Sequence, residues 1–172
     1  MASLLQRLDA RDRALFARWV LAPSRRSAVR RVWVSVTHLG GAWCTLGFAM
    51  APYLPSTPWE RPGALPLTLL VLSHLVVQVV KRTIGRPRPS CSTVRASLIE
   101  EPDRFSFPSG HSTAAMAVAL GYALSFPDLA APLVSLAVIV GLSRVVLGVH
   151  FPGDVFVGQL IACLTAIATL LR

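Results

Sequence analysis

The sequence is short of charged residues, and above all of lysine. Charged side chains make up 15% of the 172 residues, whereas 53% are hydrophobic and the mean hydropathy is +0.59. This composition is too apolar for an ordinary soluble domain. Lys81 is the only lysine among 17 basic residues, and arginine in place of lysine is the bias of a GC-rich genome. We therefore expect a bacterial protein in which Lys81 has a specific use.

The sequence also lacks the patterns of disulfide and metal sites. Its three cysteines are Cys44, Cys91 and Cys163. They do not have metal-ligand spacing, and we infer no disulfide. The acidic residues at 100–103 fall in an irregular loop, which does not suit Mg²⁺. No unbroken apolar core follows the N-terminus, so we expect no cleavable signal peptide. We expect neither a metal nor another cofactor.

The formal net charge of +9 is compatible with binding to nucleic acid or to a membrane. Nucleic-acid-binding domains spread Lys and Arg over solvated faces, with aromatic residues between them. Here the arginines collect at the ends of apolar runs, which is the pattern that orients membrane proteins. The pattern predicts an integral membrane protein that does not bind nucleic acid.

Five apolar runs approach or exceed the length that crosses a bilayer. They cover about residues 32–54, 64–80, 111–126, 129–150 and 154–171. We therefore predict an all-α integral membrane bundle of five transmembrane helices, with residues 32–172 as one membrane domain. Five spans place the N-terminus, the 81–110 loop and the 151–153 turn on the same face of the membrane.

Residues 1–31 form a basic amphipathic segment ahead of these runs. Within residues 4–20 apolar side chains recur at helical spacing, with Arg and Asp between them. The apolar positions are Leu4, Leu8, Leu15 and Trp19. The pattern predicts a helix that lies in the membrane interface, or equally one that packs on the spans of the protein itself.

Three polar clusters interrupt the apolar background, and the first covers residues 81–89 (KRTIGRPRP). It supplies Lys81 and Arg88. The prolines on either side of Arg88 restrict the backbone, which lowers the entropy lost when the guanidinium binds an oxyanion. The alternative is a basic flank that ends the second span, and Arg82 and Arg86 are given no further role.

The second cluster is Pro108-Ser109-Gly110-His111. Ser109 is a good helix N-cap, and Gly110 lets another group approach the backbone closely. A helix N-terminus offers free N–H groups and a partial positive charge, which favour an anion. His111 lies in this first turn, either as a reactive group or as a histidine that caps a neighbouring carbonyl.

The third cluster consists of Ser143-Arg144, His150 and Asp154. Arg144 lies within an apolar run, where a charge is costly unless it faces a polar cavity or a partner. His150 is expected at the C-terminal end of that helix, and Asp154 at the N-cap of the next one. A carboxylate there can hold one imidazole nitrogen and leave the other free to attack. The alternative is a histidine–aspartate cap that links two helices.

The three clusters together suit one phosphoryl group. Lys81, Arg88 and Arg144, with the backbone near Gly110, could surround its oxygens, and such transfers depend mainly on positioning and charge. One histidine can act as the nucleophile and the other as a general acid, in a mechanism without metal.

These residues resemble the signature of the type 2 phosphatidate phosphatase (lipid phosphate phosphatase) superfamily. The pattern is Lys-x6-Arg-Pro, Pro-Ser-Gly-His and Ser-Arg-x5-His-x3-Asp. The matching residues are Lys81, Arg88, Pro89, Pro108, Ser109, Gly110, His111, Ser143, Arg144, His150 and Asp154. The likeness covers about residues 64–165, and the first 30 residues contribute nothing to it.

The resemblance implies a role for each matched residue. His150 would form a phosphohistidine, oriented by Asp154, and His111 would protonate the leaving oxygen. The phosphate would be held by Lys81, Arg88, Ser109, Gly110 and Arg144. Members of the superfamily act on lipid phosphates: phosphatidate, phosphatidylglycerophosphate, polyprenyl phosphates or diphosphates, and lipid A phosphates. The sequence does not identify one of these, nor an oligomeric state.

Charge bias predicts the membrane side of the site. Residues 1–31 hold eight arginines against two aspartates, whereas the opposite face is almost free of net charge. The positive-inside rule then places the N-terminus, and the site with it, on the cytoplasmic face of a bacterial inner membrane. A lipid intermediate of the inner leaflet, such as a polyprenyl-phosphoryl sugar phosphate or phosphatidylglycerophosphate, is the corresponding substrate.

Two other functions use the same residues. A phosphotransferase would pass the phosphoryl group to a lipid or sugar, and it shares the first half-reaction. An anion transporter subunit would use the cations but not the pair His150–Asp154. Outside the clusters, His38 and His74 lie within spans and are interpreted as hydrogen-bonded packing residues.

Overall fold

The computed structural model describes residues 4–22, 27–55, 62–92, 97–101 and 103–171, and these form helices without a β-sheet. The helices are α1 (Leu4–Trp19), α2 (Ser27–His38), α3 (Ala42–Met50), α4 (Leu65–Ile84), α5 (Pro89–Ser92), α6 (Gly110–Ala123), α7 (Ala130–Val146) and α8 (Pro152–Leu170). The prediction of an all-α membrane bundle is confirmed. Arg25, Arg26, Glu60, Arg61 and Arg172, which entered the charge count, lie outside the described residues.

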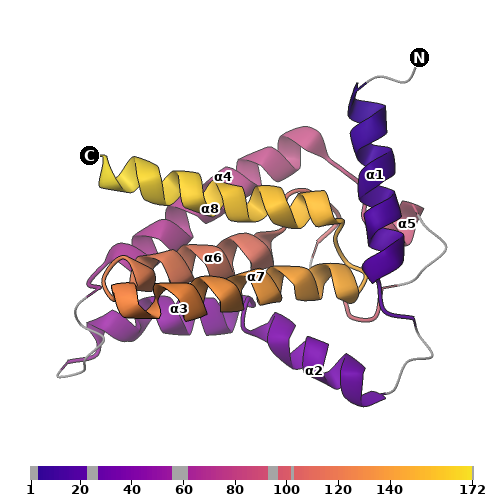
Figure 1. The fold of residues 1–172 in the computed structure, drawn as a ribbon. Helices are drawn as coiled ribbons and strands as arrows, with labels where there is room; N and C mark the ends of the chain where they lie inside the picture. The colour runs from indigo at the N-terminus through magenta and orange to yellow at the C-terminus, as the bar shows by residue number, and fades with distance from the viewer. Residues whose placement is uncertain (1–3, 23–26, 56–61, 93–96, 102, 172) are drawn as a thin grey trace.

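Helix α6 forms the centre of the bundle (Figure 1), in contact with α3, α4, α7 and α8. Ten of its 14 residues are buried, and most of them are small. Small side chains let neighbouring helices approach closely, which stabilises membrane bundles by van der Waals packing. The outer faces of α4 and α8 instead expose large apolar residues such as Val79 and Leu164, which suit contact with lipid.

Three helical segments of the described chain are long and apolar enough to cross a membrane: Leu65–Ile84, Pro127–Val146 and Pro152–Leu170. These correspond to three of the five predicted spans. The predicted span 111–126 is the shorter helix α6, which is surrounded by other helices. Apolar content alone did not distinguish this buried central helix from spans that face lipid.

The prediction of one continuous span over residues 32–54 is wrong. The helix breaks after His38 and resumes at Ala42, so α2 and α3 are separate. At the break, a Cβ on Gly40 would lie 2.6 Å from Val140 Cγ1 and 2.9 Å from the carbonyl oxygen of His111. Glycine therefore lets this turn press against α6 and α7, next to the second polar cluster.

The ends of two helices differ from prediction, and this changes where Lys81 and His150 lie. Helix α4 continues to Ile84, so Lys81 projects from its last turn. Helix α7 ends at Val146, and Gly148 follows with a left-handed φ of 82°. A left-handed residue ends a helix readily when it is glycine. His150 consequently lies in the link before α8 and not at a helix end.

Helix α1 lies across the ends of α7 and α8 (Figure 1). Phe16 and Val20 are buried in a cluster with Val145, Phe151 and Val155. The helix therefore packs on the protein itself, which was one of the two predicted alternatives. Leu15 and Trp19, assigned to its apolar face, are instead exposed.

Candidate active site

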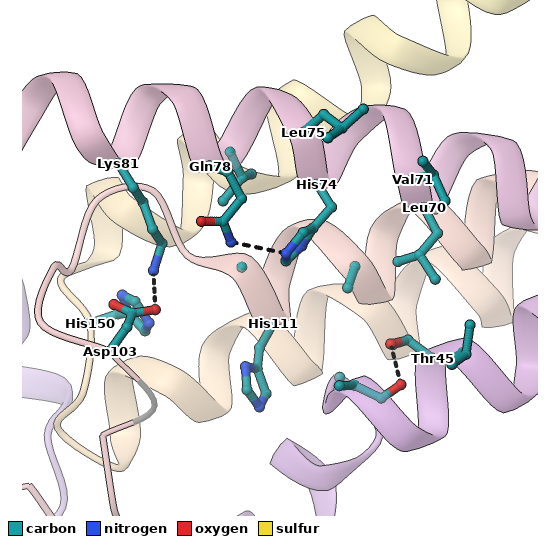
Figure 2. Close-up of a pocket in the computed structure, with 16 residues that line it drawn as sticks. Thr45, Leu70, Val71, His74, Leu75, Gln78, Lys81, Asp103, His111 and His150 are labelled. Atoms are coloured by element: carbon teal, nitrogen blue, oxygen red, sulfur yellow. Dashed lines mark hydrogen bonds and ion pairs between the residues drawn. The ribbon is translucent and has the colours of Figure 1, made fainter.

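The polar clusters meet at one end of a cavity of about 430 Å³ that is lined by α3, α4, α6 and the links beside them. The polar end carries Lys81, Asp103, Gly110, His111 and His150. The apolar wall includes Leu46, Leu70, Val71 and Leu75. Figure 2 shows this division: Lys81 and His150 lie at one end, and Leu70 and Val71 lie further along α4. The cavity is amphipathic in the way a phosphorylated lipid would require.

An acidic side chain, Asp103, holds two of the predicted phosphate ligands. Lys81 Nζ donates to Asp103 Oδ2 at 2.6 Å, and Arg88 Nη2 donates to Oδ1 at 3.0 Å. Burial raises the pKa of Asp103, but the hydrogen bond from Lys81 and the charges of Lys81 and Arg88 more than offset it and hold the pKa below its usual value. An ionised carboxylate therefore occupies donors that a phosphate would use.

Both cations have a second anchor that does not depend on the Asp103 side chain. Lys81 Nζ also donates to the carbonyl of Phe105 at 3.3 Å. Arg88 Nε donates to the main-chain oxygen of Asp103 at 2.6 Å, and Nη1 donates to the carbonyl of Val149 at 2.8 Å. Removing the carboxylate charge should therefore leave the two cations in place.

Substitution of Asp103 by asparagine should tighten phosphate binding. Asparagine removes the negative charge that competes with phosphate for Lys81 and Arg88. We expect the inhibition constant of inorganic phosphate to fall roughly fivefold, equivalent to about 1 kcal/mol. Glu100→Gln, which changes an exposed carboxylate of the same loop, is the matched control. An unchanged or weaker affinity in Asp103→Asn would instead make Asp103 a support that the cations need.

Arg144 is 1% exposed and only partly satisfied. Its Nη1 donates to Thr37 Oγ1 at 2.7 Å, whereas Nε and Nη2 have no hydrogen-bond partner within the described residues. A buried guanidinium with two unused donors is costly, which is expected where an anion completes the site. Thr37 comes from the end of α2, so the break at Gly40 helps to place the partner of Arg144.

Ser109 occupies the N-cap position of α6, but its side chain does not cap the helix. Its Oγ is buried and has no partner among the described residues. Its N–H donates to the carbonyl of Asp154 at 3.0 Å, which joins the starts of α6 and α8. A Cβ on Gly110 would meet nothing within 4 Å, so the backbone of this first turn is open to the cavity. The hydroxyl and the helix N-terminus are thus available to an anion.

His150 lies between an acid and a cation. Its Nδ1 is 3.6 Å from Asp154 Oδ2, and its Nε2 is 3.4 Å from Arg88 Nη1. Burial lowers the pKa of His150 to about 4, although Asp154 favours the charged form. The imidazole is therefore neutral near pH 7, and a neutral imidazole is the nucleophilic form. Asp154 is the third residue of α8, whose N-cap is Phe151, and it was predicted at the N-cap itself.

His111 lies in the first turn of α6 and His150 in the link before α8, and both line the same cavity. The structure thus brings Lys81, Gly110, His111 and His150 to one surface. Arg88, Ser109 and Arg144 are 1%, 0% and 1% exposed and are not among the residues that line the cavity. They lie behind this surface, and Arg88 contacts two residues that line it, His150 and Asp103.

Several residues near the site were missed or undervalued by the sequence analysis. His74 is hydrogen-bonded as predicted, with its Nε2 3.0 Å from Gln78 Nε2, but its position on the cavity wall was not predicted (Figure 2). Arg86 donates to Asp154 Oδ1 at 2.7 Å. Asp103, Thr37 and the acidic residues of α1 were also not predicted. For the acidic residues of α1, the only indication in the sequence was that two aspartates, three positions apart, share one face of an arginine-rich helix.

Comparisons with known proteins agree with this geometry. The model of the PAP2 superfamily matches residues 63–172. Decaprenylphosphoryl-5-phosphoribose phosphatase from Mycolicibacterium smegmatis is 36% identical over 131 residues, which cover 72% of this chain and 68% of the relative. Lipid A 1-phosphatase from Rhizobium etli is 37% identical over 101 residues, which cover 56% of this chain but only 44% of the relative.

A solved structure shares most of the fold. The transmembrane PAP2-type phosphatidylglycerolphosphate phosphatase from Bacillus subtilis superposes with a TM-score of 0.71 and 28% sequence identity, over 96% of this chain and 88% of the other. The fold and this comparison together define an integral membrane protein built as a helical bundle. The chain belongs to the PAP2 superfamily.

Proposed function

We propose that this protein is a lipid phosphate phosphatase that cleaves a phosphate monoester or diphosphate of a membrane lipid through a phosphohistidine. The observation that carries the proposal is the position of His150. Its Nδ1 faces Asp154 and its Nε2 lies beside Arg88, at the end of a cavity whose other walls are apolar. The first two contacts suit a phosphoryl acceptor, and the cavity suits a lipid.

In the proposed reaction, Nε2 of His150 attacks the phosphorus while the bond from phosphorus to the lipid oxygen breaks. His111 enters this step as an imidazolium and gives its proton to that oxygen, and Asp154 stabilises the positive charge that develops on His150. Water then attacks the phosphohistidine, with His111 as the base, and inorganic phosphate leaves. Lys81, Arg88, Arg144, Ser109 and Gly110 bind the phosphoryl oxygens.

The class of substrate follows from the cavity. Its apolar wall would hold the hydrocarbon part of the lipid next to the bilayer, with the phosphate at the polar end. The named relatives act on phosphorylated lipids of several kinds. We infer a polyprenyl-phosphoryl sugar phosphate, phosphatidylglycerophosphate or another lipid phosphate as the substrate.

The experiment is phosphate release by the purified protein from a panel of lipid phosphates, in EDTA and without an acceptor. Release of free phosphate by the wild type supports the proposed hydrolase, with His150→Ala as the inactive control. Turnover only after a lipid or sugar alcohol is added would identify a phosphotransferase. A requirement for added Mg²⁺ would contradict the metal-free reaction.

We also propose that the site faces the cytoplasm at a bacterial inner membrane. The support is the arginine excess of residues 1–31, together with the contact of α1 with the site end of the bundle. Cys91 is exposed at this end. In a Cys44→Ala, Cys163→Ala background it should react with an impermeant maleimide only after cells are permeabilised.

The matched control for this labelling is Asp128→Cys in a background that also lacks Cys91. Asp128 is exposed in the turn between α6 and α7, at the other end of the bundle. It should be labelled in intact cells. Labelling of Cys91 in intact cells, with Asp128→Cys protected, would reverse the proposed orientation.

A further inference from the structure

The charge network behind His150 extends well beyond the family motifs. Arg86 Nη1 donates both to Asp154 Oδ1, at 2.7 Å, and to Asp12 Oδ2, at 2.8 Å. Arg86 Nη2 donates to Asp9 Oδ1 at 2.8 Å. A single guanidinium therefore joins the carboxylate beside the catalytic histidine to two carboxylates of α1. Arg86 and its two partners on α1, Asp9 and Asp12, are not among the motif residues that this sequence matches.

The network is held in place by the backbone and by aromatic rings. Asp12 Oδ1 accepts the N–H of Gly153 at 2.7 Å, one residue before Asp154. The Arg86 guanidinium lies 4.3 Å from the ring centroid of Phe151, and Phe16 of α1 contacts the same ring at 5.2 Å. Asp12 thus touches the turn that carries Asp154 and also the arginine that binds it.

The charges explain why one arginine needs several acids. Arg86 alone beside Asp154 would cancel the negative charge that Asp154 presents to His150. Asp9 and Asp12 compensate Arg86, and Arg13 in turn pairs with Asp9 at 2.7 Å. Two arginines then face three aspartates, which leaves one net negative charge in this cluster. That charge can stabilise the His150 imidazole as it becomes positive, and it opposes the charges of Arg88 and Arg144, which act in the other direction.

Supporting pKa values are consistent with a fully ionised network. The hydrogen bond from Arg13, followed by that from Arg86, lowers the pKa of Asp9 despite partial burial. Burial lowers the pKa of Arg86, but Asp154 and Asp12 outweigh it and raise the pKa above its ordinary value.

We propose that Arg86 and Asp12 are positioning residues of the catalytic histidine, so that helix α1 contributes to the chemical step through the chain Asp12–Arg86–Asp154–His150. The inference rests on the proposed function of His150 as nucleophile. The Arg86 guanidinium is bound by Asp9, Asp12 and Asp154, and Asp12 is also bound to the Gly153 N–H, so we expect both residues to act on the rate of phosphoryl transfer and not on substrate binding.

Kinetics of matched variants tests the proposal. Asp12→Asn retains an oxygen for the Gly153 N–H but removes the charge, and it should lower kcat about tenfold with KM within twofold. Arg86→Met should lower kcat by about 10- to 100-fold, and Arg86→Lys should recover only part of it because a lysine lacks the planar fork. Arg82→Met and Asp128→Asn, which change exposed charges, should behave as the wild type.

A readout that needs no substrate separates this proposal from the proposed function. The chain has four histidines, so ¹⁵N-histidine labelling in detergent gives few signals, and His150→Gln identifies that of His150. Asp12→Asn and Arg86→Met should shift the His150 Nδ1 resonance, while the controls leave it in place. If the wild type releases no phosphate, the proposed function fails, and the spectra still decide the positioning role.

The results that overturn the inference are equally specific. Unchanged kcat and an unmoved His150 resonance in both Asp12→Asn and Arg86→Met would do so. A loss of kcat that is matched by Arg82→Met, or accompanied by a collapse of helical circular dichroism, would show a general effect on folding and would also overturn it.

Discussion

Replacement of His150 by alanine is expected to lower kcat for phosphate release by about 10⁴-fold or more, because the substitution removes the nucleophile and not one of several phosphate ligands. The side chain is 1% exposed, and its Nδ1 makes no hydrogen bond within the described residues. Little folding energy depends on that nitrogen. The variant should therefore remain helical and keep its affinity for inorganic phosphate.

The measurement is phosphate release together with trapping of the phosphoenzyme from a ³²P-labelled lipid phosphate. The wild type should yield a phosphoprotein that is labile in acid and stable in alkali, and His150→Ala should yield none. His74→Ala is the matched control, since it removes an imidazole that lines the same cavity but lies away from Asp154. An alanine variant within tenfold of wild-type kcat would exclude His150 as the nucleophile.

The second large effect concerns Arg144. Arg144→Met should reduce kcat/KM by about 10²- to 10³-fold, since it removes donors that have no protein partner and that we assign to the phosphoryl oxygens. Arg144→Lys should fail almost as badly, because an ammonium cannot supply the same planar set of donors. The positive charge that Arg144→Lys retains would then be insufficient for activity.

Stability should change in the opposite direction to activity in this case. A buried charge without a full set of partners destabilises a fold, and an apolar residue of similar volume is often neutral or better. We expect the melting temperature of Arg144→Met in detergent to equal or exceed that of the wild type, measured by circular dichroism. Arg82→Met, an exposed substitution, is the control. Lower stability with normal kcat/KM would make Arg144 a structural residue bound to Thr37.

The local pattern of the chain was sufficient for much of the fold. Apolar runs predicted α4, α7 and α8, because a helix surrounded by lipid must be apolar along its whole length. The pattern also assigned Arg144 a buried polar environment, since an arginine in such a run is otherwise too costly. Boundaries were less predictable: His150 was expected at a helix end, but Gly148 ends α7 earlier.

The same pattern could not reveal the contacts that join distant segments. Asp12 and Arg86 are 74 residues apart, and Arg86 and Asp154 are 68 apart. An aspartate on an amphipathic helix has the same local pattern whether it faces water or an arginine from another helix. For the same reason Asp103 could be interpreted as an ordinary loop residue, although it binds Lys81 and Arg88.

The sequence by itself determined the class of protein, its three polar clusters and the residues that we propose bind and accept a phosphoryl group. These properties follow from residue type and spacing along the chain. Only the tertiary structure decided three features. The first predicted span breaks at Gly40, the Asp103 carboxylate binds Lys81, and Asp12 of α1 is linked to Asp154 through Arg86. Such features depend on the distance between side chains that packing brings together, and no periodicity in the chain encodes that distance.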